Sequence, residues 1–123
     1  MQVLVDASVW IDHFRSDNTV LRRLLENDQV CIHPLVIGEL ACGTPPDRKM
    51  TLMYLKHLSS VQIATSAETL DFIEQNDLFG TGCGWVDVSL LASCLLTTGC
   101  ELWTLNKRLV KHSIRYGIQF QSS

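Results

Sequence analysis

Three carboxylates at widely separated positions are the residues in this chain that are best suited to chemistry. Asp6 ends an apolar run at residues 3–5, and Glu39 and Asp87 lie in segments of helical spacing among apolar residues. An ionised carboxylate that is buried without a partner is strongly destabilising, and this chain supplies few basic residues to pair with them. A bound divalent metal is the leading explanation, and ligands that are all oxygen atoms favour Mg²⁺ or Mn²⁺.

The spacing around each acid predicts where its side chain points. The positions three, four, seven and eight residues after Asp87 are all leucine or cysteine, so this carboxylate is expected to point inward. Glu39 shares its helical face with the apolar residues three and four positions before it. Asp6 ends the first predicted strand and Asn106 follows a later one, where open parallel sheets place their ligand crevice. These four side chains are therefore expected to meet at one edge of a sheet.

Short apolar runs alternate with helical patterns along the whole chain. Strands are predicted at residues 2–5, 30–32, 61–63, 101–105 and 118–120. Helices are predicted at residues 8–14, 19–27, 35–42, 47–58, 67–76, 86–98 and 107–116. Strands separated by helices indicate a three-layer α/β/α domain around a central, mainly parallel sheet of about five short strands. The glycine-rich run at residues 80–84 is predicted to be a loop.

Length and composition exclude several classes of protein. The 123 residues fit one domain spanning 1–123, with no linker or repeat, and 46% hydrophobic against 19% charged residues is typical of a globular chain. No apolar run is long enough to cross a membrane, and Asp6 interrupts any leader-like segment, so we expect a cytoplasmic protein. Five cysteines without paired spacing argue against disulfides and zinc, and all five are expected to be reduced packing residues.

Basic residues gather near the C-terminus although the net charge is −3. Lys107, Arg108 and Lys111 directly follow Asn106, and they could bind the phosphates of a nucleic acid if the acids lie beside them. The alternative is a solvated helix face with no ligand.

Four segments, each holding one or more of these polar residues, are similar to the motifs of a known family. They are Val5-Asp6-Ala7-Ser8-Val9-Trp10-Ile11, Ile37-Gly38-Glu39-Leu40, Gly84-Trp85-Val86-Asp87 and Leu102-Trp103-Thr104-Leu105-Asn106-Lys107-Arg108-Leu109. Together they resemble a PIN domain and, more narrowly, the VapC toxins of type II toxin-antitoxin systems. Each motif alone recurs by chance, whereas four in the expected order over the whole chain form a specific signal.

The resemblance implies a Mg²⁺-dependent or Mn²⁺-dependent endoribonuclease that is inhibited by a cognate VapB-like antitoxin and forms a homodimer. Asp6, Glu39 and Asp87 match the metal-binding acids of the family, and Asn106 stands where many members have a fourth Asp. An amide adds no negative charge, which weakens the case for a second metal. The family chemistry implies RNA products with 5′-phosphate and 3′-hydroxyl ends.

Residues around these acids take supporting roles in the same interpretation. Ser8 and Thr104 match small hydroxyl positions near the site and are expected to orient its ligands. Lys107, Arg108 and Lys111 are expected to bind the RNA backbone, which the acids alone would repel.

Other interpretations of the same residues remain open. A turn is a less favoured explanation for Asp6, as are a helix start for Asp87 and an ion pair for Glu39, whereas a helix cap explains Asn106 as well as a ligand role does. A PIN-fold module that binds RNA or protein with weak or no catalysis is the main alternative function. A phospho-receiver domain has a similar fold, but it needs an adjacent acidic pair after the first strand, and Ala7 and Ser8 follow Asp6 here.

Overall fold

The computed structural model describes residues 1–122, which form four strands and seven helices. The strands are β1 (Gln2–Val5), β2 (Val30–Ile32), β3 (Ser59–Ser60) and β4 (Cys100–Trp103). The helices are α1 (Ala7–Ser16), α2 (Thr19–Glu26), α3 (Pro34–Ala41), α4 (Arg48–Lys56), α5 (Ser66–Gln75), α6 (Trp85–Leu96) and α7 (Lys107–Arg115). Each predicted helix is present, with its ends shifted by at most two residues.

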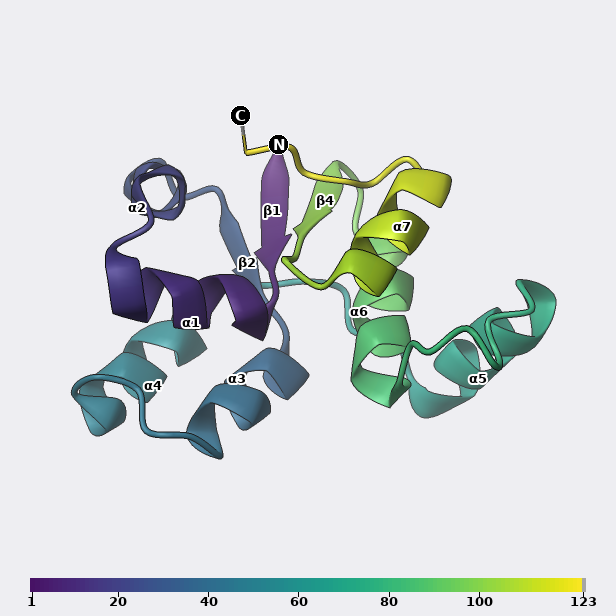
Figure 1. The fold of residues 1–123 in the computed structure, drawn as a ribbon, viewed down its shortest axis with the longest axis horizontal. Helices are drawn as coiled ribbons and strands as arrows, with labels where there is room; N and C mark the ends of the chain where they lie inside the picture. Colours follow the sequence, from purple (N-terminus) through teal and green to yellow (C-terminus); the bar gives the residue numbers. More distant parts are fainter. Residues whose placement is uncertain (123) are drawn as a thin grey trace.

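The four strands form one sheet in the order β3-β2-β1-β4, and all pairings are parallel. Helices α1 to α4 lie on one side of the strands and α5 to α7 on the other in the view of Figure 1. The predicted α/β class with a parallel sheet is therefore confirmed. Because β1 and β4 are neighbours, the residues that follow them emerge side by side, and the Asp6 N–H donates to the carbonyl of Trp103 at 2.9 Å.

Two strand predictions need correction. The strand expected at residues 61–63 is the two-residue β3 at Ser59–Ser60, and Val61 extends it by a single hydrogen bond to Ile32. The strand expected at residues 118–120 is one isolated bridge between Gln119 and Leu102. Both segments have apolar residues of the strand type, but each makes too few consecutive pairings to form a ladder.

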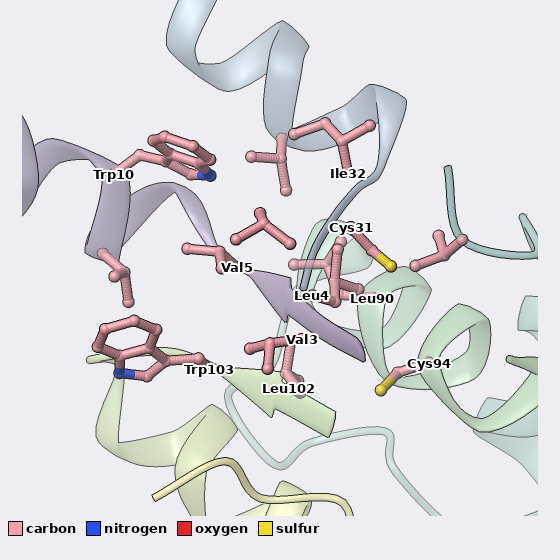
Figure 2. Close-up of a cluster of buried hydrophobic side chains, with 14 of the residues drawn as sticks. Val3, Leu4, Val5, Trp10, Cys31, Ile32, Leu90, Cys94, Leu102 and Trp103 are labelled. Carbon is pink, nitrogen blue, oxygen red and sulfur yellow. The ribbon is translucent and has the colours of Figure 1, made fainter. Parts of the chain in front are cut away.

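The core packs both faces of β1 against helices. Val3, Leu4 and Val5 are 0% exposed, because β1 lies between two neighbouring strands. Figure 2 shows Trp10 and Trp103 packed around this strand, with Leu90 and Cys94 of α6 on its other side. Burial of this size is the main stabilising contribution to the fold and holds the end of β1 rigidly.

The cysteines differ in burial. All five are free, but only Cys31, Cys94 and Cys100 are buried, whereas Cys83 is half-buried and Cys42 is exposed. The prediction that all five are packing residues is therefore wrong for Cys42, which is the exposed C-cap of α3. Separately, none of the helices within residues 1–122 combines the length and the apolar character needed to cross a membrane.

Candidate functional site

Asp6 lies at the junction of β1 and α1, in the N-cap position of the helix. Its side chain does not cap the helix. It is buried, and its Oδ2 atom accepts hydrogen bonds from Ser8 Oγ at 2.8 Å and Thr104 Oγ1 at 2.7 Å. A charged acceptor makes both bonds stronger than neutral ones, so the carboxylate is held in one orientation.

Main-chain donors set the direction of these two hydroxyl groups. Ser8 Oγ accepts from the N–H of Leu105 at 3.0 Å, and Thr104 Oγ1 accepts from the N–H of Asn106 at 3.1 Å. Each hydroxyl carries one proton, which is left to donate to Asp6. The 3.4 Å between Ser8 Oγ and Thr104 Oγ1 is thus a contact between two groups that both face the same carboxylate. The geometry is that of an oriented ligand, and the supporting role of the two hydroxyls stays a prediction.

The other two acids lie within electrostatic reach of Asp6. Partial shielding from solvent raises the pKa of Glu39, and the charges of Asp6 and Asp87 raise it further. Burial also raises the pKa of Asp87, the hydrogen bond from the Gly84 N–H partly offsets this, and Asp6 raises the pKa again. A carboxylate that raises the pKa of two others lies within electrostatic range of both. The three acids, which come from distant parts of the sequence, therefore lie in one region of the fold.

Glu39 is less enclosed than its spacing indicated. The residue is exposed, because Val36 and Leu40 occupy the inner face of α3 and leave Glu39 at its edge. It lines a cleft of about 440 Å³ together with apolar residues of α1 and the loop after α3. The expectation that its side chain points into the core is wrong, and it instead faces the space between α1 and α3.

Within residues 1–122, none of the three acids forms an ion pair with a basic residue. Within residues 1–122, the ion pairs are those of Asp17 with His13 and with Arg22. The alternative in which Glu39 is neutralised by an arginine is therefore not observed. Over the same range, no three His, Cys, Asp or Glu side chains are already grouped closely enough to hold a metal ion. A cation would have to draw these carboxylates together, and their oxygen atoms and excess negative charge suit a hard divalent ion.

Two of the predicted site residues also have structural roles. Asp87 is in the first turn of α6, and its Oδ2 accepts from the Gly84 N–H at 3.4 Å, as in a capping box. Asn106 is the N-cap of α7, and its Oδ1 accepts from the N–H groups of Arg108 and Leu109 at 3.0 and 3.4 Å. The carbonyl oxygen that would contact a metal or a phosphate is thus used by the helix. Any catalytic role for Asn106 stays a prediction.

The predicted RNA-binding residues lie on α7, which starts directly after Asn106. Lys107, Arg108 and Lys111 are all exposed. Arg108 also reaches back to the glycine-rich loop, where its Nη1 donates to the carbonyl of Gly82 at 3.4 Å. The loop therefore joins the basic start of α7 to the entry of the helix that carries Asp87.

Sequence reasoning missed His33, which connects the two helices that carry acids. His33 is buried and is the N-cap of α3, where its Nδ1 accepts from the N–H of Leu35 at 3.0 Å. Its Nε2 bonds the hydroxyl of Ser93 on α6 at 3.2 Å, and that hydroxyl also accepts from Ala64 N–H. The available signal was a polar residue directly before Pro34, because proline favours the first position of a helix.

Comparison with known proteins agrees with this fold and arrangement. A model of the PIN domain family matches residues 3–114, and the chain belongs to that family. Within it the chain is VapC-like, being 43% identical over 107 residues to Ribonuclease VapC32 of Mycobacterium tuberculosis, in strains CDC 1551 / Oshkosh and ATCC 25618 / H37Rv. The match covers 87% of this chain and 86% of that protein.

A solved structure of VapBC-1 from nontypeable Haemophilus influenzae has the same fold. The TM-score is 0.70 at 16% identity, and the match covers 98% of this chain and 97% of that one. The resemblance inferred from the four motifs is thus confirmed at the level of family and fold.

Proposed function

We propose that the chain is a metal-dependent endoribonuclease that acts as the toxin of a type II toxin-antitoxin module. One observation carries the proposal: the charge of Asp6 raises the pKa of both Glu39 and Asp87, and none of the three acids has a basic partner in residues 1–122. The kinship with Ribonuclease VapC32 supports RNA as the substrate. Such a toxin would act in the cytoplasm, where RNA is translated.

In this proposal the three acids would hold Mg²⁺ or Mn²⁺. When bound, an ion of this kind lowers the pKa of water and offsets charge on a scissile phosphate. Ser8 and Thr104 fix Asp6 by donating to its Oδ2, so that its other oxygen stays free. Water adds in line to phosphorus and the bond to the 3′ oxygen breaks, which leaves 5′-phosphate and 3′-hydroxyl ends.

The basic start of α7 would bring the RNA backbone to these acids. Lys107, Arg108 and Lys111 are exposed and supply positive charge next to a negative cluster that would otherwise repel phosphate.

An antitoxin and a second copy of the chain are the proposed protein partners. The cleft beside Glu39 is also bordered by the basic Arg15 and by apolar residues, namely Ile11, Phe14, Leu40, Pro45 and Pro46. An amphipathic segment of a VapB-like antitoxin could occupy such a surface. The fold shared with the VapBC-1 structure supports this assignment, and we propose a homodimer by analogy with the family.

A PIN-fold module that binds RNA or protein with weak or no catalysis is the second candidate. Asn106 favours it, because this residue adds no fourth negative charge and its side-chain oxygen caps α7. The two candidates differ in whether RNA is cut when Mg²⁺ is present.

Isosteric removal of charge separates these two functions. We expect Asp6→Asn or Asp87→Asn to lower Mg²⁺-dependent cleavage of a mixed RNA substrate by at least a hundredfold, because each removes a ligand oxygen charge. Asp71→Asn, on α5, is the matched control and should cleave normally. Circular dichroism would verify that each variant folds. Cleavage by either site variant at the rate of the unmodified protein would rule out the enzymatic proposal. Suppression of toxicity by the product of a small adjacent reading frame would test the toxin role.

A further inference from the structure

The side chain of Arg108 lies across the main chain of Gly82. Arg108 Nη1 donates to the Gly82 carbonyl at 3.4 Å. A Cβ atom added to Gly82 would be 3.0 Å from each of three Arg108 atoms, Cδ, Nε and Cζ. Carbon and nitrogen atoms normally stay farther apart than this, so the arginine occupies the space that only a glycine leaves free.

This contact places a cation at the loop that leads into α6, the helix that carries Asp87. The Cys83 thiol, next to Gly82, is close to both charges: burial and Asp87 raise its pKa, whereas a Thr81 hydrogen bond and Arg108 lower it. Among residues 1–122, the side chain of Arg108 forms no ion pair. Its only hydrogen bond within these residues is the one that it donates to the Gly82 carbonyl. Most donors of the guanidinium are therefore available to a ligand.

Arg108 differs in this respect from the other two predicted RNA-binding residues. Lys107 and Lys111 make no side-chain hydrogen bond or ion pair within the part of the chain that the structure describes. A long side chain that is free in solution loses rotamer entropy when it binds, whereas one held against the loop loses less. A planar guanidinium also matches phosphate with two parallel bonds, which an ammonium group cannot do.

We infer that Gly82, because it has no side chain, lets Arg108 lie against the loop. The guanidinium held in this position is the principal phosphate contact beside the three acids. Lys107 and Lys111 add general attraction. This inference rests on the proposed function and deepens it, since it names the residue that receives the RNA backbone and the loop position that holds it.

The loop offers a matched pair of variants. Gly82→Ala places a methyl group against Arg108, at a φ of +87°. Gly80→Ala imposes a similar backbone strain, at a φ of +71°, with nothing within 4 Å of the added Cβ. Any difference between the two variants therefore reports displacement of Arg108 and not the cost of a left-handed alanine.

Two measurements apply to these variants. The first is kcat/KM on a fluorogenic RNA that the unmodified protein cleaves with Mg²⁺. The second is RNA affinity across a salt series in an Asp6→Asn background, which reads binding without cleavage. We expect Gly82→Ala and Arg108→Ala each to lower kcat/KM by about tenfold or more, a typical effect of losing a charged hydrogen bond. Each should also reduce the salt slope by about 0.7, one phosphate contact on a single strand.

A double-mutant cycle then tests whether Gly82 acts through its contact with Arg108. In the Arg108→Ala background, Gly82→Ala should have no more effect than Gly80→Ala, because there is no guanidinium left to displace. Equal effects of Gly82→Ala and Gly80→Ala in the presence of Arg108 would overturn the inference. So would an effect of Gly82→Ala that persists without Arg108.

Two further comparisons keep the outcome decisive. If Gly82→Ala fails to fold by circular dichroism, Arg108→Ala is compared with Lys111→Ala, which removes an equal charge from the same helix. A loss for Lys111→Ala as large as that for Arg108→Ala would contradict the special position of Arg108. If the unmodified protein binds RNA but does not cleave it, the proposed enzyme fails while the binding series still decides the role of Arg108.

Discussion

At the scale of single residues, the most defined feature is the orientation of Asp6 by two hydroxyl groups. Ser8 and Thr104 reach the same oxygen of its carboxylate from β1–α1 and from the end of β4. Both hydroxyls are turned toward it by main-chain N–H donors. Groups that orient a metal ligand typically change metal affinity or activity by 10- to 100-fold when removed.

Removal of the Thr104 hydroxyl is predicted to weaken the site without disrupting the fold. Thr104→Val keeps the shape of the side chain but loses the 2.7 Å bond to Asp6, so we expect cleavage with Mg²⁺ to fall by about tenfold. Thr69→Val is the control, because it removes a buried hydroxyl bond within α5. Steady-state kinetics over a Mg²⁺ series would measure both. Identical Mg²⁺ dependence in the two variants would argue against an orienting role for Thr104.

The sequence identified candidate residues for this site, but it predicted their burial and their hydrogen bonds less well. Spacing placed Asp6 and Asp87 near apolar neighbours, and both are at least half-buried. Glu39 is exposed. This was not predicted, because helical periodicity identifies an apolar face but not the edge of that face. The capping role of Asn106 depends on where α7 begins, which periodicity locates only to within a few residues.

At the scale of elements, His33 joins α3 to α6 and so links the helices that carry Glu39 and Asp87. Its Nδ1 accepts from Leu35 N–H and must therefore be unprotonated, which leaves the ring proton on Nε2 to bond Ser93. Burial lowers the pKa of His33, in agreement with a neutral ring. The hydrogen bond between His33 and Ser93 could not be predicted from sequence, since 60 residues separate them.

The buried, hydrogen-bonded His33 is predicted to make the stability of the fold depend on pH. Because the folded pKa of His33 lies below the ordinary 6.5, the unfolded chain binds more protons as the pH falls through 6.5. The stability from His33 is therefore present above that pH and lost below it. His33→Asn keeps a cap acceptor but does not titrate, and it should cost about 1–2 kcal/mol at pH 7.5 and less at pH 5.5.

Urea unfolding of both proteins at the two pH values would measure this change. The difference in unfolding free energy between the unmodified protein and His33→Asn isolates the histidine from other titrating groups. A difference that does not shrink between pH 7.5 and pH 5.5 would mean that His33 does not titrate across unfolding in this range.

Pairing between elements also explains which strands were predicted correctly. The strands β1, β2 and β4 are apolar and buried, and their predicted positions agree with the structure to within one or two residues. The segments near residues 60 and 119 lie at the two ends of the sheet order, where only one neighbour can fix the pairing. A local pattern indicates the capacity to form a strand, whereas its exact register depends on that neighbour.

At the scale of the whole molecule, we expect Glu39 and Asp87 to lower the stability of the fold near neutral pH. The folded pKa values of Glu39 and Asp87 are raised, so their protonated forms stabilise the folded protein below the ordinary carboxyl pKa. That contribution is lost as the pH rises through the raised values. Near neutral pH the cluster therefore costs stability, as expected for a site that is arranged for binding a cation and not for folding.

Glu39→Gln is predicted to raise the thermal midpoint at pH 7.5 by a small amount, because solvent screens part of the repulsion at this exposed carboxylate. The gain should vanish near pH 4, where Glu39 is protonated in the unmodified protein and the repulsion is already gone. Calorimetric scans at both pH values would measure it, with Glu74→Gln as the control on α5. A lower midpoint for Glu39→Gln at pH 7.5 would indicate a stabilising ion pair instead.

The most direct test of the account is a titration of the purified protein with Mn²⁺, measured by isothermal titration calorimetry. If Asp6, Glu39 and Asp87 act together, the unmodified protein should bind one Mn²⁺ ion at pH 7.5, and binding should weaken as the pH falls toward the raised pKa values of Glu39 and Asp87. Asp6→Asn and Asp87→Asn should each abolish the binding heat. Binding of equal strength in either variant would show that these carboxylates do not form a metal site.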